Sequence, residues 1–108
     1  MGTYVIIHNM RVIARSTLKR FYGIPDYSES KEPLEAWYYE AKNASWYSWT
    51  NIKEKYGNAS ILKNNRVVFN ICGNKYRLVV KINYEAQIVF IRFIGTHKEY
   101  DKIDVEAI

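Results

Sequence analysis

Three side chains that can move protons or attract a phosphate stand close together near the C-terminal end of the sequence: His97, Lys98 and Tyr100. Imidazole and phenol groups exchange protons in enzymes, and an ammonium group attracts negative charge. The three residues directly follow an apolar run that is typical of a strand. A histidine and a tyrosine at a strand end can also be ordinary packing residues, so both interpretations stay open.

A row of cations precedes this group. Between residues 75 and 83, Lys75, Arg77 and Lys81 alternate with apolar residues. Successive side chains of a strand point to opposite faces, so the pattern predicts one core face and one exposed, cationic face. A sheet that presents such a face is suited to binding a polyanion such as the phosphate chain of a nucleic acid.

The distribution of charge supports the same partner. The chain of 108 residues has a formal net charge of +5. Residues 63–98 alone carry seven Lys or Arg against Glu85, a local charge of +6. Binding of a phosphate chain there would be strongly salt-dependent. The alternative is a merely solvated charged face.

One cation, Arg92, lies inside the strand predicted over Gln87–Ile94. The apolar residues that share its side by alternation are Ile88, Phe90 and Ile94. Because apolar residues occupy both sides, we expect both faces to be covered and the strand to be central in the sheet. Arg92 is then either paired with Asp101 or Asp104, or retained for function.

The elements that must position these groups follow from periodicity. We first expect a strand over 10–14 and a helix that is capped by Ser16 or Thr17 and ends near Gly23. A polar loop over 26–31 follows, and then a helix that begins near Ser30 and carries Pro33 in its first turn. A further helix begins at Ser45 or Ser48 and ends at Gly57. Strands over 66–71, 75–84 and 87–94 follow, with turns at Gly73-Asn74 and Glu85-Ala86.

Composition excludes several classes of protein. No run of about eighteen apolar residues is present, so we expect no membrane span. The single cysteine, Cys72, cannot form an internal disulfide, and we expect it to be packed rather than reactive. His8 and His97 have no spacing that suggests metal ligation, so no metal site is expected. We expect one cytoplasmic domain.

The order of a strand, helices and a three-stranded antiparallel meander resembles the RelE/ParE superfamily of bacterial toxins, and local sequences resemble its HigB type. The segments that carry this resemblance are Arg11–Lys19, Trp37-Tyr38, Ala59–Leu62, Val67–Ile71, Gly73–Leu78 and Gly95–Asp101. The resemblance covers residues 10–108 as one toxin domain and leaves 1–9 as an N-terminal extension. It implies an α+β, RelE-like fold: an N-terminal strand and helices packed on a small, mainly antiparallel sheet that ends in a three-stranded meander.

The resemblance implies an mRNA interferase, an endoribonuclease that usually cleaves ribosome-bound mRNA and is neutralised by a HigA-type helix-turn-helix antitoxin. No metal or cofactor is implied, because the RNA 2′-OH supplies the nucleophile. For catalysis we expect Arg77 and Arg92 to stabilise charge, and His97 and Tyr100 to transfer protons. The residues expected to position RNA are Lys63, Arg66, Asn70, Asn74, Lys75, Lys81 and Lys98.

Two other functions remain possible for the same sequence. A ParE-like gyrase poison would inhibit a DNA topoisomerase without cleaving RNA; His97 and the basic sheet face argue weakly against it. A non-catalytic RNA-binding module would present stacked aromatic side chains on its exposed sheet face. The exposed positions of residues 75–83 are instead mostly Lys and Arg.

Overall fold

A computed structural model of the chain describes residues 9–108. The N-terminal extension predicted over 1–9, with His8, lies outside the described residues except for Asn9. The strands are β1 (Arg11–Ile13), β2 (Ser60–Ile61), β3 (Arg66–Ile71), β4 (Tyr76–Asn83) and β5 (Ile88–Thr96). The helices are α1 (Arg15–Tyr22), the 3₁₀ helix η1 (Pro25–Ser30), α2 (Lys31–Lys42), α3 (Trp49–Lys55) and α4 (His97–Tyr100). The predicted α+β class is confirmed.

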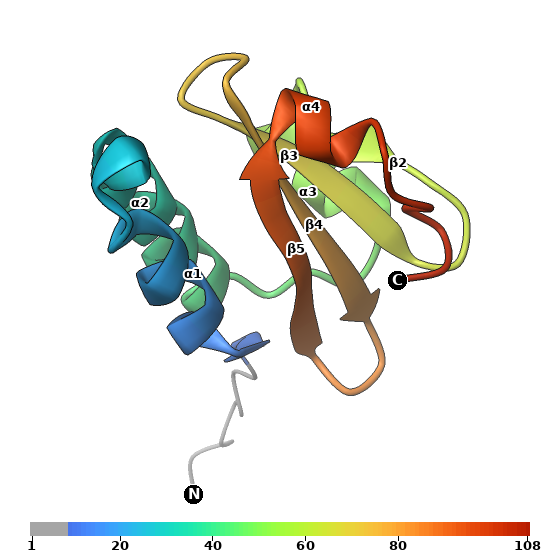
Figure 1. Cartoon of the computed structure of the whole chain (residues 1–108). Coiled ribbons are helices and arrows are strands. Elements are labelled where there is room, and N and C mark those ends of the chain that lie inside the picture. Colours follow the sequence, from blue (N-terminus) through green and yellow to red (C-terminus); the bar gives the residue numbers. More distant parts are fainter. Residues whose placement is uncertain (1–8) are drawn as a thin grey trace, which may run out of the picture.

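The strands form one mixed sheet in the order β1-β5-β4-β3-β2 (Figure 1). Strands β3, β4 and β5 make the antiparallel meander expected from the sequence, and β1 pairs with β5 in parallel. Strand β5 is therefore paired on both sides, but the middle strand of the sheet is β4. Strand β2 has only two residues and was not predicted.

One face of the sheet holds the core, as the alternation in β4 predicted. Tyr76, Leu78, Val80 and Ile82 of β4 are all buried on it. They join a core cluster with residues of the helices, among them Leu18, Leu34, Trp37, Ala41 and Ile52. Complete burial of one such aliphatic side chain contributes about 1.5–3 kcal/mol. Figure 1 shows α3 behind this face and α1 and α2 at the side of the sheet.

Capping residues were predicted correctly for one helix and wrongly for another. Ser48 and Asn51 form a reciprocal capping box at the start of α3, where Ser48 was one of two predicted caps. Helix α1 instead starts after Ala14, which has no side-chain capping bond, so the expected cap at Ser16 or Thr17 is wrong. Helix α2 follows Ser30 as expected, but the Ser30 hydroxyl donates to the carbonyl of Tyr27 (2.6 Å). No helix within residues 9–108 is both long enough and apolar enough to cross a membrane.

The segment expected to be a polar loop over 26–31 is largely the 3₁₀ helix η1. Aromatic packing holds it in place. The ring of Tyr27 stacks on Phe21 of α1 with centroids 4.5 Å apart, and meets the edge of Tyr76 of β4 at 5.8 Å. Pattern reasoning missed this, because a single tyrosine in a polar stretch gives no periodic signal.

A β-bulge in β5 corrects the expected orientation of its side chains. Val79 of β4 lies opposite Phe93, whereas the next residue, Val80, lies opposite Ile91, so Arg92 is an extra residue. Beyond the bulge Ile94 packs against the core, so it does not share a side with Arg92 as the alternation predicted. The expectation that both faces of this strand are covered is also wrong, because Arg92 is exposed and Phe90 only half-buried.

The turn between β3 and β4 contains the predicted pair Gly73-Asn74. Cys72 and Gly73 adopt positive φ values of 54° and 63°. Gly73 suits this conformation because it has no Cβ. The Cys72 thiol is half-buried near the carbonyl of Glu29, and burial raises its pKa.

Candidate nucleic-acid interface

The face of the sheet opposite the core carries the predicted cations, but half of it is covered. Figure 1 shows α4 and the segment after it on this face, running from the end of β5 to a position beside the start of β3. Val79 of β4 points to this face and is nevertheless 0% exposed. We call the part under residues 97–108 the covered half; it contains Arg66, Val68, Arg77 and Val79. The fully open face expected from the sequence is wrong for this half.

Arg66, predicted to position RNA, is fixed by the C-terminal segment. Its side chain donates from Nε to the main-chain oxygen of Ile108 (3.0 Å), and a second nitrogen, Nη2, also donates to that oxygen. Nη1 donates to the carbonyl of Asn64 (2.8 Å). Arg66 is 7% exposed. Its guanidinium therefore ties the start of β3 to the C-terminal segment instead of facing solvent.

Arg77 is likewise buried, at 8% exposure, although an exposed cation was expected. One nitrogen, Nη1, donates to the carbonyls of Asn74 (3.1 Å) and Tyr76 (3.2 Å). The other, Nη2, donates to Oδ1 of Asn74 (2.9 Å). Within residues 9–108 these contacts use only part of the guanidinium's donor capacity. Arg77 thus brings a positive charge to the turn and fixes the orientation of Asn74.

Alternation had predicted that Lys75 and Arg77 share a face, but they do not. It lies in the turn before β4, and its ammonium group binds both carboxylate oxygens of Glu29 (2.9 and 3.1 Å). Tyr76, on the core side, donates to the same carboxylate (2.8 Å). The hydrogen bonds from Lys75 and Tyr76 lower the pKa of Glu29, while burial and the bond to Glu29 raise that of Tyr76 to about 12. Lys75 therefore helps to attach η1 to the sheet.

His97 is the first residue of the short helix α4. The Thr96 hydroxyl accepts from the main-chain N–H of Glu99 (3.2 Å), and the Glu99 carboxylate accepts from that of Thr96 (2.9 Å). This capping box holds the imidazole on the first turn, with its side chain 51% exposed. Nδ1 of His97 lies 3.1 Å from Oδ2 of Asp101, one turn later.

The contact with Asp101 assigns roles to the two ring nitrogens. An ionised carboxylate only accepts hydrogen bonds, so Nδ1 carries the proton in this pair and Nε2 is left to exchange one. Sequence reasoning named His97 but did not place Asp101 in the site, although the spacing of four residues is a helical one. The Tyr100 ring, half-buried, lies 6.4 Å from the imidazole between centroids.

Several predicted site residues meet at one end of the sheet. Strand pairing places Arg77 opposite Asn70 on one side and Gly95 on the other. The main-chain N–H of His97 donates to the carbonyl of Lys75 (3.1 Å), which attaches α4 to the β3–β4 turn. We call this group the strand-end cluster; its members are Asn70, Asn74, Arg77, His97, Lys98, Tyr100 and Asp101.

The glycine within this region has a steric reason. A Cβ on Gly95 would lie 2.6 Å from Cζ of Phe93 and 3.1 Å from a carboxylate oxygen of Glu99. The Phe93 ring therefore lies against the backbone at Gly95, next to the capping box of α4. A larger residue at this position would displace the ring or the cap.

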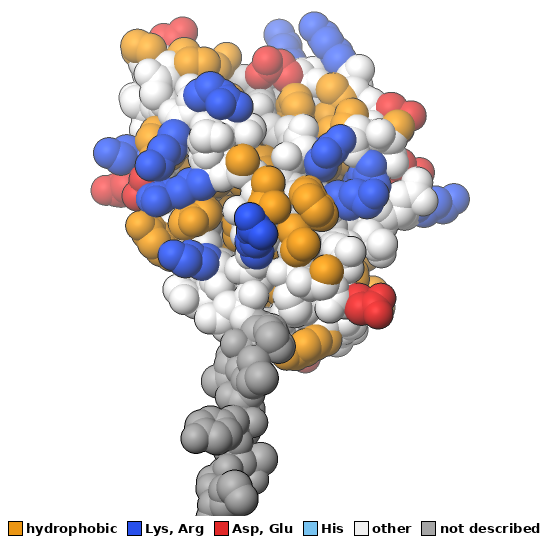
Figure 2. Space-filling view, turned by 90° about the horizontal axis from the view of Figure 1, so that it is seen from below, with side chains coloured by type: hydrophobic (Ala, Val, Ile, Leu, Met, Phe, Trp, Pro, Cys, Tyr) orange, Lys and Arg blue, Asp and Glu red, His pale blue; other side chains and the backbone are white. Residues whose placement is uncertain are grey.

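The remaining part of this sheet face is not under the C-terminal segment. We call it the uncovered half; it consists of Arg11, Ile13, Lys81, Asn83, Ile88, Phe90 and Arg92. Within residues 9–108, no hydrogen bond or ion pair joins Arg92 to Asp101 or Asp104, so the structural alternative considered for it does not hold here. Lys63 and Lys98, outside this half, are exposed as well. Figure 2 shows Lys and Arg side chains interspersed with hydrophobic ones on one side of the molecule.

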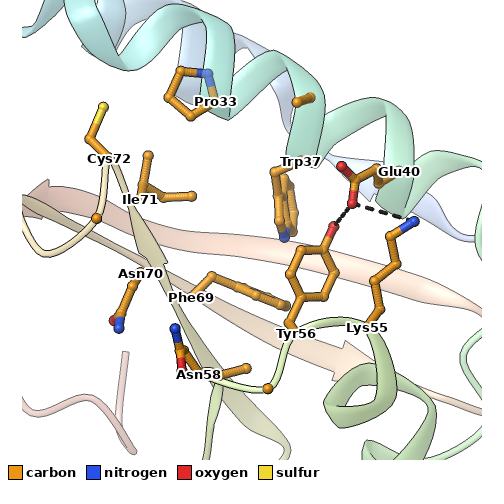
Figure 3. Close-up of a pocket in the computed structure, with 14 residues that line it drawn as sticks. Pro33, Trp37, Glu40, Lys55, Tyr56, Asn58, Phe69, Asn70, Ile71 and Cys72 are labelled. Atoms are coloured by element: carbon orange, nitrogen blue, oxygen red, sulfur yellow. Dashed lines mark hydrogen bonds and ion pairs between the residues drawn. The ribbon is translucent and has the colours of Figure 1, made fainter.

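The hollow shown in Figure 3 shares only Asn70 with the strand-end cluster. It measures about 470 Å³ and lies between α2 and the edge of β3, with Trp37, Tyr56 and Phe69 among its lining residues. Glu40 accepts from the Tyr56 hydroxyl (2.5 Å) and pairs with Lys55 (3.6 Å) at its rim. Of the predicted site residues, only Asn70 lines this hollow.

Comparison with known proteins identifies relatives of this chain. Residues 30–103 match a family described as the HigB toxin, the RelE-like toxic component of a toxin–antitoxin system. The mRNA interferase toxin HigB of Escherichia coli (strain K12) is 50% identical over 34 residues, 32% of this chain and 33% of that protein. The mRNA interferases HigB of Escherichia coli O157:H7 and Shigella flexneri match to the same extent. These alignments span about a third of each relative's length. Because the family match covers more than half of the chain, this protein belongs to the HigB toxin family.

Proposed function

We propose that the chain is an mRNA interferase, the toxin of a type II toxin–antitoxin pair, with a RelE-like domain over residues 10–108. The observation that supports this most is the pair of His97 and Asp101 at the end of a cationic sheet face. It supplies an exposed proton-exchanging nitrogen two residues after Gly95, which lies opposite Arg77 in the sheet. The names of the three relatives support the same activity.

The reaction we infer needs no nucleophile from the protein. The RNA 2′-oxygen loses its proton and attacks the adjacent phosphorus, and the bond from phosphorus to the 5′-oxygen breaks. The products are a 2′,3′-cyclic phosphate and a 5′-hydroxyl, which takes up a proton. His97 provides one of the two proton transfers through Nε2, and Tyr100 is the candidate for the other. A well-placed acid or base contributes about 10²- to 10⁴-fold in rate.

Negative charge on the phosphate needs a positive environment. Arg77 lies at the strand-end cluster, and its bonds to Asn74 and Tyr76 hold it in a fixed orientation. Preorganised charge of this kind needs no reorganisation during the reaction. Lys98 is exposed on α4 beside His97, and Arg92 lies further along β5. We infer that Arg77 supplies the local field, while Lys98 and Arg92 contact phosphates directly.

Cleavage of a translated message tests the proposal. Wild-type protein made by cell-free synthesis should produce defined stops in primer extension on a reporter mRNA, and His97→Gln should not. Running the reaction with and without ribosomes shows whether ribosome-bound mRNA is the substrate. An intact message together with inhibited DNA supercoiling would instead identify a gyrase poison. RNA binding without cleavage in either reaction would identify a non-catalytic module.

The proposed partners follow from the same family membership. We infer a HigA-type helix-turn-helix antitoxin that neutralises the toxin, and action in the cytoplasm, where mRNA and ribosomes are found. Co-expression of the chain with the product of an adjacent helix-turn-helix gene should restore growth and yield a complex on purification. Growth inhibition that no such gene relieves would contradict this assignment.

A further inference from the structure

We propose that Phe90 stacks on a base of the RNA and forms, with Arg11 and Lys81, a second RNA contact on the uncovered half, several nucleotides from the cleaved bond. The inference rests on the proposed function, because it takes single-stranded RNA as the substrate. It adds an aromatic contact on β5. The sequence had not suggested one, because the exposed positions of β4 are mostly Lys and Arg.

The position of Phe90 is the first observation. Strand pairing places it directly between Lys81 of β4 and Ile13 of β1, on the face of the sheet opposite the core. Neighbouring strands lie about 4.8 Å apart, so these three side chains stand side by side across roughly 10 Å. Phe90 is half-buried, and no other aromatic ring among residues 9–108 stacks on it. Part of its side chain is therefore accessible to a planar partner.

The surrounding charge is the second observation. Lys81 lies directly across from Phe90, and Arg11 lies opposite Ile88, two residues earlier on β5. Both cations are exposed. An aromatic ring flanked by cations is the arrangement that binds single-stranded nucleic acids without strong sequence preference, because bases stack while phosphates pair with Lys or Arg.

Charge also argues against a second copy of the chain as the occupant. In a two-fold dimer the same patch would face itself, so Arg11, Lys81 and Arg92 would approach the same three cations. Like charges placed opposite one another across an interface are unfavourable. A polyanion relieves this repulsion, which is why we assign RNA to the surface.

The distance to the strand-end cluster sets where on the RNA the contact falls. Phe90 precedes His97 by seven residues along β5, which at about 3.3 Å per residue corresponds to roughly 20 Å. The stacked base is thus several nucleotides from the bond that His97 would act on. Arg92 lies between the two places and would contact the phosphates that connect them.

Binding of RNA to an inactive full-length chain tests the inference. Fluorescence anisotropy of a labelled, unstructured 12-nucleotide RNA is measured with the His97→Gln protein and with His97→Gln combined with Phe90→Leu, Phe90→Trp or Trp49→Leu. Leucine keeps an apolar side chain but removes the ring. Trp49, an exposed aromatic residue at the start of α3, serves as the matched control.

We expect Phe90→Leu to weaken binding about tenfold and Phe90→Trp to retain it, because stacking accounts for a change of that order. The dependence of log affinity on log salt should be the same in both variants, since no charge is removed. Trp49→Leu should bind like its parent. Circular dichroism melting identifies any variant that has lost its fold. If Phe90→Leu has lost its fold, the RNA affinity of Phe90→Trp decides whether the inference holds.

Equal affinity for Phe90→Leu and its parent would overturn the inference. So would a concentration-dependent dimer, detected by light scattering, that Phe90→Leu abolishes. Failure of the proposed function has a different signature, because wild-type protein would then cleave no message at all. If the wild type cleaves the message but Phe90→Leu leaves the RNA affinity unchanged, only the stacking contact is refuted.

Discussion

The two halves of the sheet face opposite the core contain the same kind of residue in opposite environments. Arg66 and Arg77, in the covered half, are 7% and 8% exposed and hydrogen-bonded to main-chain oxygens. Lys81 and Arg92, in the uncovered half, are exposed. Alternation along β4 places Arg77 and Lys81 on the same side of that strand. The difference arises from the segment 97–108, which packs on one half only.

This difference separates two ways in which a cation serves a site. A buried guanidinium with fixed partners provides structure and a preorganised charge, so its removal should affect both stability and activity. An exposed cation contacts a ligand and adds little to the fold, so its removal should affect binding alone. The contrast between Arg77 and Lys81 makes this distinction measurable in a single chain.

The largest expected effect lies at the strand-end cluster, where the covered half meets α4. His97→Gln should lower single-turnover cleavage of RNA by about 10²- to 10⁴-fold, because glutamine cannot exchange a proton near neutral pH. Asp101→Asn should lower it less, because the imidazole remains and the amide oxygen can still accept from Nδ1, although the negative charge of the acceptor is lost. Both residues are exposed, so melting temperatures should change little. Wild-type cleavage by His97→Gln would make Tyr100 the next residue to test.

Arg77→Ala should separate the covered half from the uncovered half. We expect a loss of about 1–3 kcal/mol in the free energy of unfolding, because the side chain of Asn74 and the carbonyl of Tyr76 lose buried donors. Growth inhibition should also be lost. Urea unfolding measures the change in the free energy of unfolding. It compares purified, inactive His97→Gln protein with and without Arg77→Ala. An unfolding free energy unchanged within about 0.5 kcal/mol would show that Arg77 is not held as the structure has it.

Lys81→Ala is the matched change in the uncovered half. The unfolding free energy should stay within about 0.5 kcal/mol of the parent, because an exposed side chain is removed. Affinity for single-stranded RNA should fall several-fold, and the salt slope should decrease by about 0.7 for one lost phosphate contact. Anisotropy titrations at three or more salt concentrations give this slope. An unchanged slope would place Lys81 outside the RNA path.

The smallest effect is expected away from both halves, at the ion pair of Glu29 and Lys75. Hydrogen bonds from Lys75 and Tyr76 lower the pKa of Glu29, so the ionised carboxylate stabilises the fold above its unfolded pKa of about 4.3. This stabilisation is lost as the pH falls through the lowered folded pKa. Glu29→Gln should therefore melt slightly earlier than wild type near pH 7.

The pH dependence of that difference provides the control. Melting curves of wild type and Glu29→Gln should converge as the pH falls below about 4, because the wild-type carboxyl then becomes protonated. The expected difference is small because the pair is exposed to solvent. If the difference in melting temperature between the two proteins persists unchanged in acid, the ion pair is not its cause.

Local patterns in the sequence determined much of this protein. Alternation over residues 76–83 assigned the core side of β4 correctly, since side chains of a strand alternate whatever packs on them. Three- and four-residue spacing predicted α2, and Ser48 was one of two predicted caps for α3. His97 was selected as a site residue from its chemical type and its place after a strand.

Only the tertiary structure decided which of the cations are accessible. The cover over Arg66 comes from Ile108, 42 residues away in sequence, and the partner of Lys75 is Glu29, 46 residues away. The bulge at Arg92 depends on pairing with β4 and not on its own neighbours. Periodicity reports how a segment alternates between two sides, but not what packs against either side. That depends on contacts between distant segments, which no local window of sequence contains.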